Sequence, residues 1–307
     1  MRFLILLLTA LAAVTALPRS TAAAALFQPG FELVAASERV FARPHDLVLS
    51  PDGKYLLVSD LGHDEIKIVD PMTLKVVSTL GSGELAAPHD VTFLDANTVL
   101  VADTSNDRIA VYDFGGVGAD GKAVARLTAS WRAHILNPEG VAVAPGGDFI
   151  YVTNVGHNSL VRLNRKGELV NGVGGYHPRD MVSFTRPHDV AVHADGRVFV
   201  ADSGDDRMVI LNPELVFLRK FKGDPWNFDD PKYMAFDAQG DLWLADEYNS
   251  RVLHLDAAMT VKQIIGTGEK GDGPGQLNWP EGVEVKGDLI WISDTYNDRL
   301  LLLRRLK

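Results

Sequence analysis

The sequence predicts an all-β fold, a six-bladed β-propeller of four-stranded antiparallel blades. One pattern of short strands recurs six times, each copy opens at a proline, and the last copy stops one strand short. The prolines are Pro44, Pro88, Pro138, Pro187, Pro231 and Pro280. Their separations of 44, 50, 49, 44 and 49 residues are typical of a propeller or repeat array rather than of separate domains.

Each copy carries the signals of antiparallel strands joined by tight turns. The second strand of a copy reads VFVAD from Val198 or LWLAD from Leu242, and such branched and aromatic runs are typical of strands buried on both faces. Asp52-Gly53 and Asp195-Gly196 mark hairpin turns before these strands. The sixth copy ends at Lys307 after its third strand, so we predict that residues 31–41 supply the fourth strand and close the ring.

Residues 1–25 read as a secretory signal peptide. Arg2 is followed by an apolar stretch at residues 3–17 and by small residues at 20–25. The apolar stretch is short for a membrane span. We therefore expect a single propeller over residues 26–307, in the periplasm or secreted. The chain has no cysteine, so neither a lipid-anchored cysteine nor a disulfide is expected.

The charge balance argues against nucleic acid as a partner. The net charge is −10, and removing residues 1–25 with Arg2 and Arg19 makes it −12. Phosphate binding needs clustered cations, so we expect no nucleic acid as a partner. We also expect no membrane partner after signal cleavage, and a monomer. The expected partner is a small polar ligand, a peptide or a glycan.

The residues that follow the opening prolines form the most informative constellation. In blade order they are His45, His89, Glu139, His188, Lys232 and Glu281. Each enters the innermost strand of its blade, so a propeller gathers them around the central channel, on the face that carries the crossovers between blades. Three imidazoles and two carboxylates suit a divalent metal, with zinc preferred and calcium as the alternative. We predict His45, His89, His188, Glu139 and Glu281 as its ligands.

The next residue along each first strand could orient a histidine of the adjoining blade, since neighbours in a strand point to opposite sides. Asp46, Asp90 and Asp189 follow the three histidines, and a metal-binding imidazole usually donates its second N–H to such an acceptor. The alternative is that Pro-His-Asp is a folding element whose histidine bonds to the backbone. No H-x-x-x-H, H-E-x-x-H or C-x-x-C spacing decides between the two.

A second recurring element is interpreted as structural. Asp103, Asn106 and Arg108 recur at equivalent places in most copies. Asp and Asn side chains bond to nearby backbone amides, and Arg can pair with a carboxylate. An element present in most blades is typically one that each blade needs to fold.

These patterns resemble the NHL-repeat family of six-bladed propellers. The resemblance rests on V-A-D-x-x-N-D-R, as at Val101 to Arg108, and on GTGEKGDGPGQLNWPEGV from Gly266, and covers residues 40–307. The Pro-His-Asp copies look like the blade entrances at which peptidyl-hydroxyglycine α-amidating lyases hold zinc through three histidines. Those ligands come from alternate blades, whereas here they come from blades one, two and four, so the resemblance implies neither the same metal geometry nor the same substrate. Streptogramin lyases and gluconolactonase-like propellers are more distant in architecture.

The sequence thus predicts an exported propeller that binds a small polar ligand through a divalent metal in its central pocket. If it is an enzyme, we expect a metal-dependent lyase or hydrolase. Tyr176, His177 and Arg179, in the crossover after blade three, are the predicted catalytic residues, and Trp226 and Trp279 are candidates for further pocket walls. The alternative is a non-catalytic scaffold that binds a protein or glycan through the same face.

Overall fold

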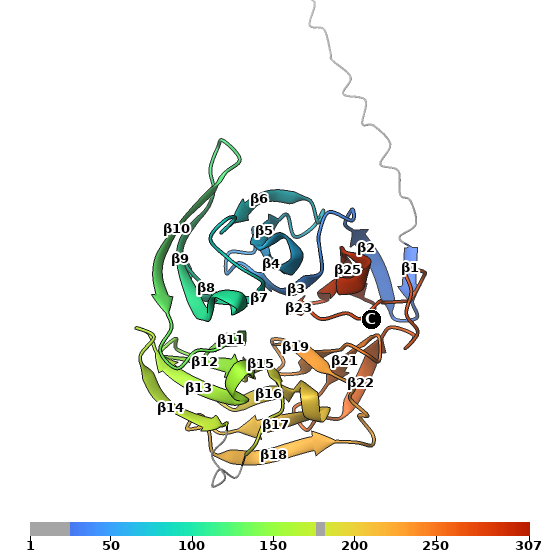
Figure 1. Ribbon diagram of the computed structural model, residues 1–307. Helices are drawn as coiled ribbons and strands as arrows, with labels where there is room; N and C mark the ends of the chain where they lie inside the picture. Colours follow the sequence, from blue (N-terminus) through green and yellow to red (C-terminus); the bar gives the residue numbers. More distant parts are fainter. Residues whose placement is uncertain (1–24, 176–181) are drawn as a thin grey trace, which may run out of the picture.

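The computed structural model describes residues 25–175 and 182–307. This part of the chain forms six antiparallel sheets arranged as a ring (Figure 1). The six-bladed β-propeller fold is therefore confirmed. No helix among the described residues is long and apolar enough to cross a membrane.

Five sheets have four strands each, and their strands follow one another along the chain. Blade one contains β3 (Pro44–Leu49), β4 (Leu56–Asp60), β5 (Glu65–Val69) and β6 (Val76–Leu80). Blade two contains β7 (Pro88–Asp95), β8 (Thr98–Asp103), β9 (Arg108–Val117) and β10 (Ala123–Trp131). Blade three contains β11 (Pro138–Val143), β12 (Phe149–Asn154), β13 (Ser159–Asn164) and β14 (Leu169–Gly174). Blade four contains β15 (Pro187–Val192), β16 (Val198–Asp202), β17 (Arg207–Leu211) and β18 (Phe217–Lys222). Blade five contains β19 (Pro231–Phe236), β20 (Leu242–Asp246), β21 (Arg251–Leu255) and β22 (Val261–Ile265).

The sixth sheet joins the two ends of the described chain. It contains β23 (Val283–Lys286), β24 (Leu289–Asp294) and β25 (Arg299–Arg305), and then β2 (Phe31–Ala36) and β1 (Ala25–Gln28). Leu33 of β2 lies opposite Leu303 of β25, so the predicted closure by the N-terminal strand is confirmed (Figure 1). One detail differs from the prediction, because this sheet has five strands. Gly30, at a φ of 87°, turns the chain and adds β1 outside β2.

The core lies between the blades. In the described part, six apolar clusters each combine residues of two neighbouring blades. The cluster between blades six and one includes Trp291, Leu302 and Leu56, and the Trp291 indole donates to the carbonyl of Pro71 at 2.7 Å. Because no cluster is confined to one blade, each blade is stabilised chiefly by burying apolar area against its neighbours.

The recurring Asp-Asn-Arg element is structural, as predicted. The carboxylate of Asp103 accepts bonds from Arg108 Nε at 2.5 Å, from Asn106 at 2.9 Å, and from the backbone N–H of Ala86 at 2.8 Å. The same Asp–Arg pairs occur at Asp202 and Arg207, Asp246 and Arg251, and Asp294 and Arg299. Each carboxylate thereby fastens the crossover to the second and third strands of its blade. Short 3₁₀ turns follow this Asp or its counterpart in five blades: η1 (Leu61–His63), η2 (Thr104–Asn106), η3 (Val155–His157), η4 (Ser203–Asp205) and η5 (Thr295–Asn297).

Candidate functional site

The three histidines that follow opening prolines lie together at one mouth of the central channel. The ring centroids of His45 and His89 are 4.9 Å apart, and those of His89 and His188 are 6.1 Å apart. The Tyr233 ring of blade five lies 4.8 Å from that of His188. Blades one, two and four therefore bring their imidazoles to one place, and His45 and His188 are buried there.

Both predicted carboxylate ligands face these imidazoles. Glu281 Oε2 lies 3.2 Å from His45 Nε2. Glu139 lies between the other two histidines, with Oε2 3.3 Å from His188 Nε2 and Oε1 3.9 Å from His89 Nε2. The structure thus places all five predicted metal ligands in one cluster, which we call the His–Glu ring.

The charge states in the His–Glu ring are set mainly by burial. Burial lowers the pKa of His45 and of His89 to about 3. Burial likewise raises the pKa of Glu139 and of Glu281 to about 7. The imidazoles are consequently neutral at pH 7, and their contacts with the carboxylates are not ion pairs.

The tautomer of His45 follows from its backbone contact. His45 Nδ1 lies 2.9 Å from the carbonyl oxygen of Arg43, and a carbonyl can only accept, so Nδ1 carries the proton. In a neutral imidazole the other nitrogen, Nε2, then presents a lone pair to Glu281 at 3.2 Å. Two lone pairs that face each other at this distance need a shared proton or a cation between them.

The expected role of the three aspartates was wrong. Asp189 accepts the backbone N–H of Met234 at 2.9 Å, and Asp90 accepts that of Val141, so these carboxylates tie neighbouring blades together. Two of the histidines bond to the backbone instead: His45 Nδ1 to the Arg43 carbonyl, and His89 Nδ1 to the Ala87 carbonyl at 3.0 Å. The physical reason is a shift of strand register at each Pro-His-Asp copy, which takes these residues out of regular alternation.

An acidic cavity lies further along the channel. Its volume is about 320 Å³, and its acidic lining residues are Asp46, Asp90, Asp189 and Glu284. Burial raises the pKa of each of these carboxyls, that of Asp90 to about 7. The channel therefore offers a histidine-rich mouth followed by a carboxyl-lined interior.

One charged residue beside the His–Glu ring, Glu247, was missed in the sequence. Lys232 Nζ lies 3.2 Å from Glu247 and 3.4 Å from Asp230, and Glu247 is buried. Glu247 follows the strand-ending Asp246, at a position where the other blades have Leu61, Thr104, Val155, Ser203 and Thr295. Glu247 is the one acidic residue at this position of the six copies, and this departure from the repeat could have been noticed in the sequence.

The other predicted site residues do not belong to the His–Glu ring. Tyr176, His177 and Arg179 lie outside the described residues. Trp226 packs at 5.0 Å from Phe221 and donates its indole N–H to the carbonyl of Met259 at 2.6 Å. Trp226 is therefore a packing residue between blades four and five.

Two protein-family models match the chain. The model described as lactonase, 7-bladed beta-propeller matches residues 23–183, just over half of the sequence, and an NHL repeat model matches residues 184–211. The chain belongs to this lactonase-type propeller family. The structure shows six blades for this member, and the NHL resemblance is confirmed by the second model.

Individual relatives of this lactonase-type propeller are distant. NHL repeat-containing protein 3 of Mus musculus is 26% identical over 146 residues, which cover 41% of each protein. The virginiamycin B lyase of Staphylococcus aureus is 15% identical, with a TM-score of 0.56 over 86% of this chain and 81% of the other. An auxiliary nutrient binding protein of Bacteroides thetaiotaomicron is 12% identical, with a TM-score of 0.63 over 86% and 69%. The two structural likenesses establish the fold alone.

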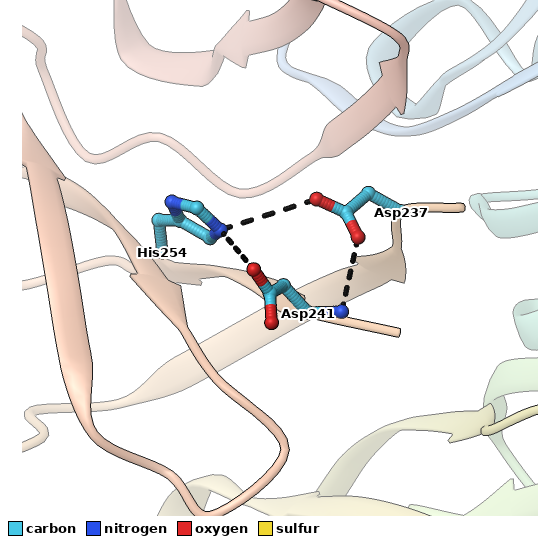
Figure 2. A group of neighbouring side chains, drawn as sticks. All are labelled: Asp237, Asp241 and His254. Carbon is cyan, nitrogen blue, oxygen red and sulfur yellow. Dashed lines mark hydrogen bonds and ion pairs between the residues drawn. The ribbon is translucent and has the colours of Figure 1, made fainter. Parts of the chain in front are cut away.

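A second cluster has metal-like spacing (Figure 2). Asp237, Asp241 and His254 of blade five are the one group of at least three such residues in the described ranges whose ligand atoms all lie within 4.8 Å of one another. The sequence did not reveal it, because His254 is far from the two aspartates along the chain. The His–Glu ring is wider than this limit as it stands.

The groups of this second cluster already have protein partners. Lys262 Nζ lies 2.5 Å and His254 Nε2 3.0 Å from Asp241 Oδ2. Asp237 Oδ2 accepts the Trp243 indole at 3.3 Å, while its Oδ1 accepts the backbone N–H of Asp241 at 3.0 Å (Figure 2). We therefore interpret the cluster as a hydrogen-bonded network that stabilises the β19–β20 turn and leaves no need for a metal.

Replacing Gly282 by alanine should destabilise the lactonase-type propeller and disturb its His–Glu ring. A Cβ at this position would lie 2.4 Å from the carbonyl oxygen of His45 and 2.9 Å from Ser293 Oγ. Relieving that overlap requires moving the backbone of blade one, at a cost of about 1–3 kcal/mol. Urea unfolding measures the cost. Gly273→Ala is the control, since a Cβ there meets only the flexible end of Gln276, and equal stability of the two variants would contradict the prediction.

Proposed function

We propose that the channel mouth binds a small polar ligand through a divalent metal ion held by the His–Glu ring. The observation that carries this is the opposition of neutral imidazole and carboxyl groups, since His45 Nε2 and Glu281 Oε2 face each other at 3.2 Å without opposite charges. A cation between such groups would satisfy both. Zinc suits this mixture of nitrogen and oxygen donors, and calcium is the alternative.

Orphaned buried atoms support the fit of a metal and its ligand. His188 Nδ1, Glu281 Oε2 and the Tyr233 hydroxyl are buried without a hydrogen-bond partner in the described part of the chain. Buried polar atoms normally have partners, so three orphans around one channel mouth favour a site that a ligand completes. The wide spacing of the ring means that the side chains would have to close around an ion.

When bound, the metal would supply Lewis-acid polarisation of a ligand oxygen. Residues of the chain would bind the ligand, balance charge and transfer protons. Tyr233 would donate its free hydroxyl to the ligand, and Lys232 would balance the negative charge of Glu247 and Glu281. Tyr176, His177 and Arg179 remain the proposed groups for proton transfer and ligand orientation.

The reaction class that we propose, if the protein is an enzyme, is a lyase or a hydrolase acting on a small polar substrate. The lactonase family model and the fold shared with a virginiamycin B lyase and a nutrient binding protein are compatible with catalysis and with binding. Export through a signal peptide at residues 1–25, to the periplasm or outside the cell, is part of the proposal.

Metal content tests the proposed function directly. Protein purified without chelator or immobilised nickel should carry about one divalent ion per chain by mass spectrometry. His45→Ala/His188→Ala should lose it, and His45→Gln/His188→Gln, which keeps the volume, guards against misfolding. The exposed His134→Ala is the matched control. A metal-free wild type would overturn the metal site, and a metal lost only in His254→Ala would move it to the second cluster.

A further inference from the structure

Blades five and six differ from the other four at the channel mouth. The second residue after each strand-ending Asp or Asn is small in blades one to four, where it is Gly62, Ser105, Gly156 or Gly204. In blades five and six it is Tyr248 and Tyr296, whose side chains are 47% and 42% exposed. Large exposed aromatics on one side of a repeating structure are not needed for the repeat to fold, so they point to a ligand.

Trp279 lies between the two tyrosines. Its ring centroid is 5.2 Å from that of Tyr248 and 4.8 Å from that of Tyr296. Lys270 Nζ lies 3.2 Å from the centre of the Trp279 ring, so a cation already occupies one face of the indole. We call Tyr248, Trp279 and Tyr296 the aromatic shelf.

The backbone under Trp279 is strained. The residue before each opening proline has a positive φ, and that of Trp279 is 49°, a region that bulky side chains rarely adopt. The indole N–H of Trp279 is also buried without a partner in the described part of the chain. Because the positive φ recurs in all six copies, the feature that favours a ligand here is the unpartnered indole N–H.

The junction between blades five and six lacks a side-chain bond that three of the other junctions have. A hydroxyl donates to the carbonyl of the next opening proline in three blades, Thr104 to Pro138, Ser203 to Pro231 and Thr295 to Pro44. Blade five has Glu247 at that place, and the Ser250 hydroxyl of the same turn is buried without a partner in the described ranges. Glu247 pairs with Lys232 instead, so the Ser250 hydroxyl is the group of this turn that could still bond to a ligand.

The backbone at Arg43 is fastened to the turn that carries Tyr296. The backbone N–H of Arg43 donates to Asp298 at 2.9 Å, and the carbonyl of Pro44 accepts from Thr295 at 2.8 Å. Both partners belong to the turn that carries Tyr296, so Arg43 and Tyr296 start from neighbouring positions. The Arg43 side chain is exposed and makes no ion pair with the described residues. In a chain of net charge −10, a free cation beside exposed aromatics points to an anionic ligand.

We propose that the aromatic shelf and Arg43 form a binding subsite for an acidic oligosaccharide, a chain of sugar rings that carry carboxylates. The C–H face of a sugar ring packs on the electron-rich face of an aromatic ring, and three adjacent rings offer more surface than one sugar covers. The guanidinium of Arg43 matches a carboxylate with two parallel hydrogen bonds.

Other ligand classes fit the subsite less well. Lys270 and Arg43 disfavour a cationic ligand. A purely apolar ligand would leave Arg43 without a partner. The subsite opens on the same channel mouth as the His–Glu ring, but its binding does not require the metal.

Oligomers of galacturonate, with neutral galactose oligomers of equal length for comparison, test the subsite by calorimetry. Wild type should bind the acidic oligomers more tightly. Arg43→Gln should weaken that binding by about tenfold or more and leave the weaker neutral binding unchanged. Arg126→Gln makes the same change of charge on the exposed part of β10 and should have no effect. Tyr248→Ala/Tyr296→Ala should abolish binding, while Tyr248→Phe/Tyr296→Phe should keep it.

The same titrations separate this subsite from the metal site. Chelator-treated wild type and His45→Gln/His188→Gln should bind the acidic oligomers as the untreated protein does, so failure of the metal proposal leaves the subsite standing. Equal affinity for acidic and neutral oligomers would overturn the proposal. So would the absence of binding at millimolar concentration, or full binding by Arg43→Gln.

Discussion

Deleting residues 31–41 should unfold the propeller or leave it only marginally stable. The deletion removes β2, which pairs with β25 from Phe31 to Ala36 and whose Phe31 is 2% exposed. It exposes the apolar edge of β25 and opens the clusters on both sides of blade six. The lost burial alone amounts to about 5 kcal/mol or more, comparable to the whole stability of a typical domain.

Thermal unfolding and gel filtration measure the effect of this deletion. We expect a lost or strongly lowered transition, with aggregation through the exposed strand edge. Deleting residues 25–30 is the comparison, because it removes β1 and the buried Phe27 but leaves the pairing of β2 with β25. Its effect on stability should therefore be smaller. A peptide of residues 25–41 added to the deleted protein should restore part of the stability. An unchanged melting temperature after deletion of residues 31–41 would show that closure contributes nothing.

Replacing Asp103 by alanine should cost about 3–5 kcal/mol, the usual price of leaving one partner of a buried pair alone. Asp103 is fully buried and joins Arg108, Asn106 and the backbone of Ala86. Its loss leaves a buried guanidinium and a backbone N–H without an acceptor, and it frees the crossover that leads to His89.

Chemical denaturation compares Asp103→Ala with Asp95→Ala. Each variant removes the carboxylate of an Asp–Arg pair, but only the first pair is buried, so the difference measures the effect of burial. Asp95, of the same blade as Asp103, pairs with Arg165 of blade three at 2.9 Å, and both side chains are nearly half exposed. Its removal should therefore cost about 1 kcal/mol or less. Similar losses in the two variants would mean that the recurring Asp–Arg pair is not a fold-stabilising element.

The blade count and the ring closure were predictable because both depend on local patterns. Strand alternation, turn residues and the opening prolines recur in every copy, and the last copy stops one strand short. The meeting of His45, His89 and His188 was predictable for a related reason. A propeller places the first strand of every blade at the axis, so equivalent positions in the repeat become neighbours in space.

Side-chain partners were less predictable, because they depend on register and on the neighbouring blade. Their residue type suggested that Asp90 and Asp189 would orient histidines of adjoining blades, yet they accept backbone amides of the next blade instead. The extra strand β1 depends on a turn at Gly30 and on an open edge of β2. Neither follows from the repeat.

The sequence by itself determined the six blades, their closure and the residue types around the axis, because short-range strand and turn preferences repeat along the chain. Only the tertiary structure decided which of these groups face each other. It set Glu281 against His45 and Glu139 against His188, placed Lys232 beside Glu247, and gathered Tyr248, Trp279 and Tyr296 into one shelf. Such contacts are made across blade junctions, where the packing of two sheets, and not the pattern within either, fixes the distance between side chains.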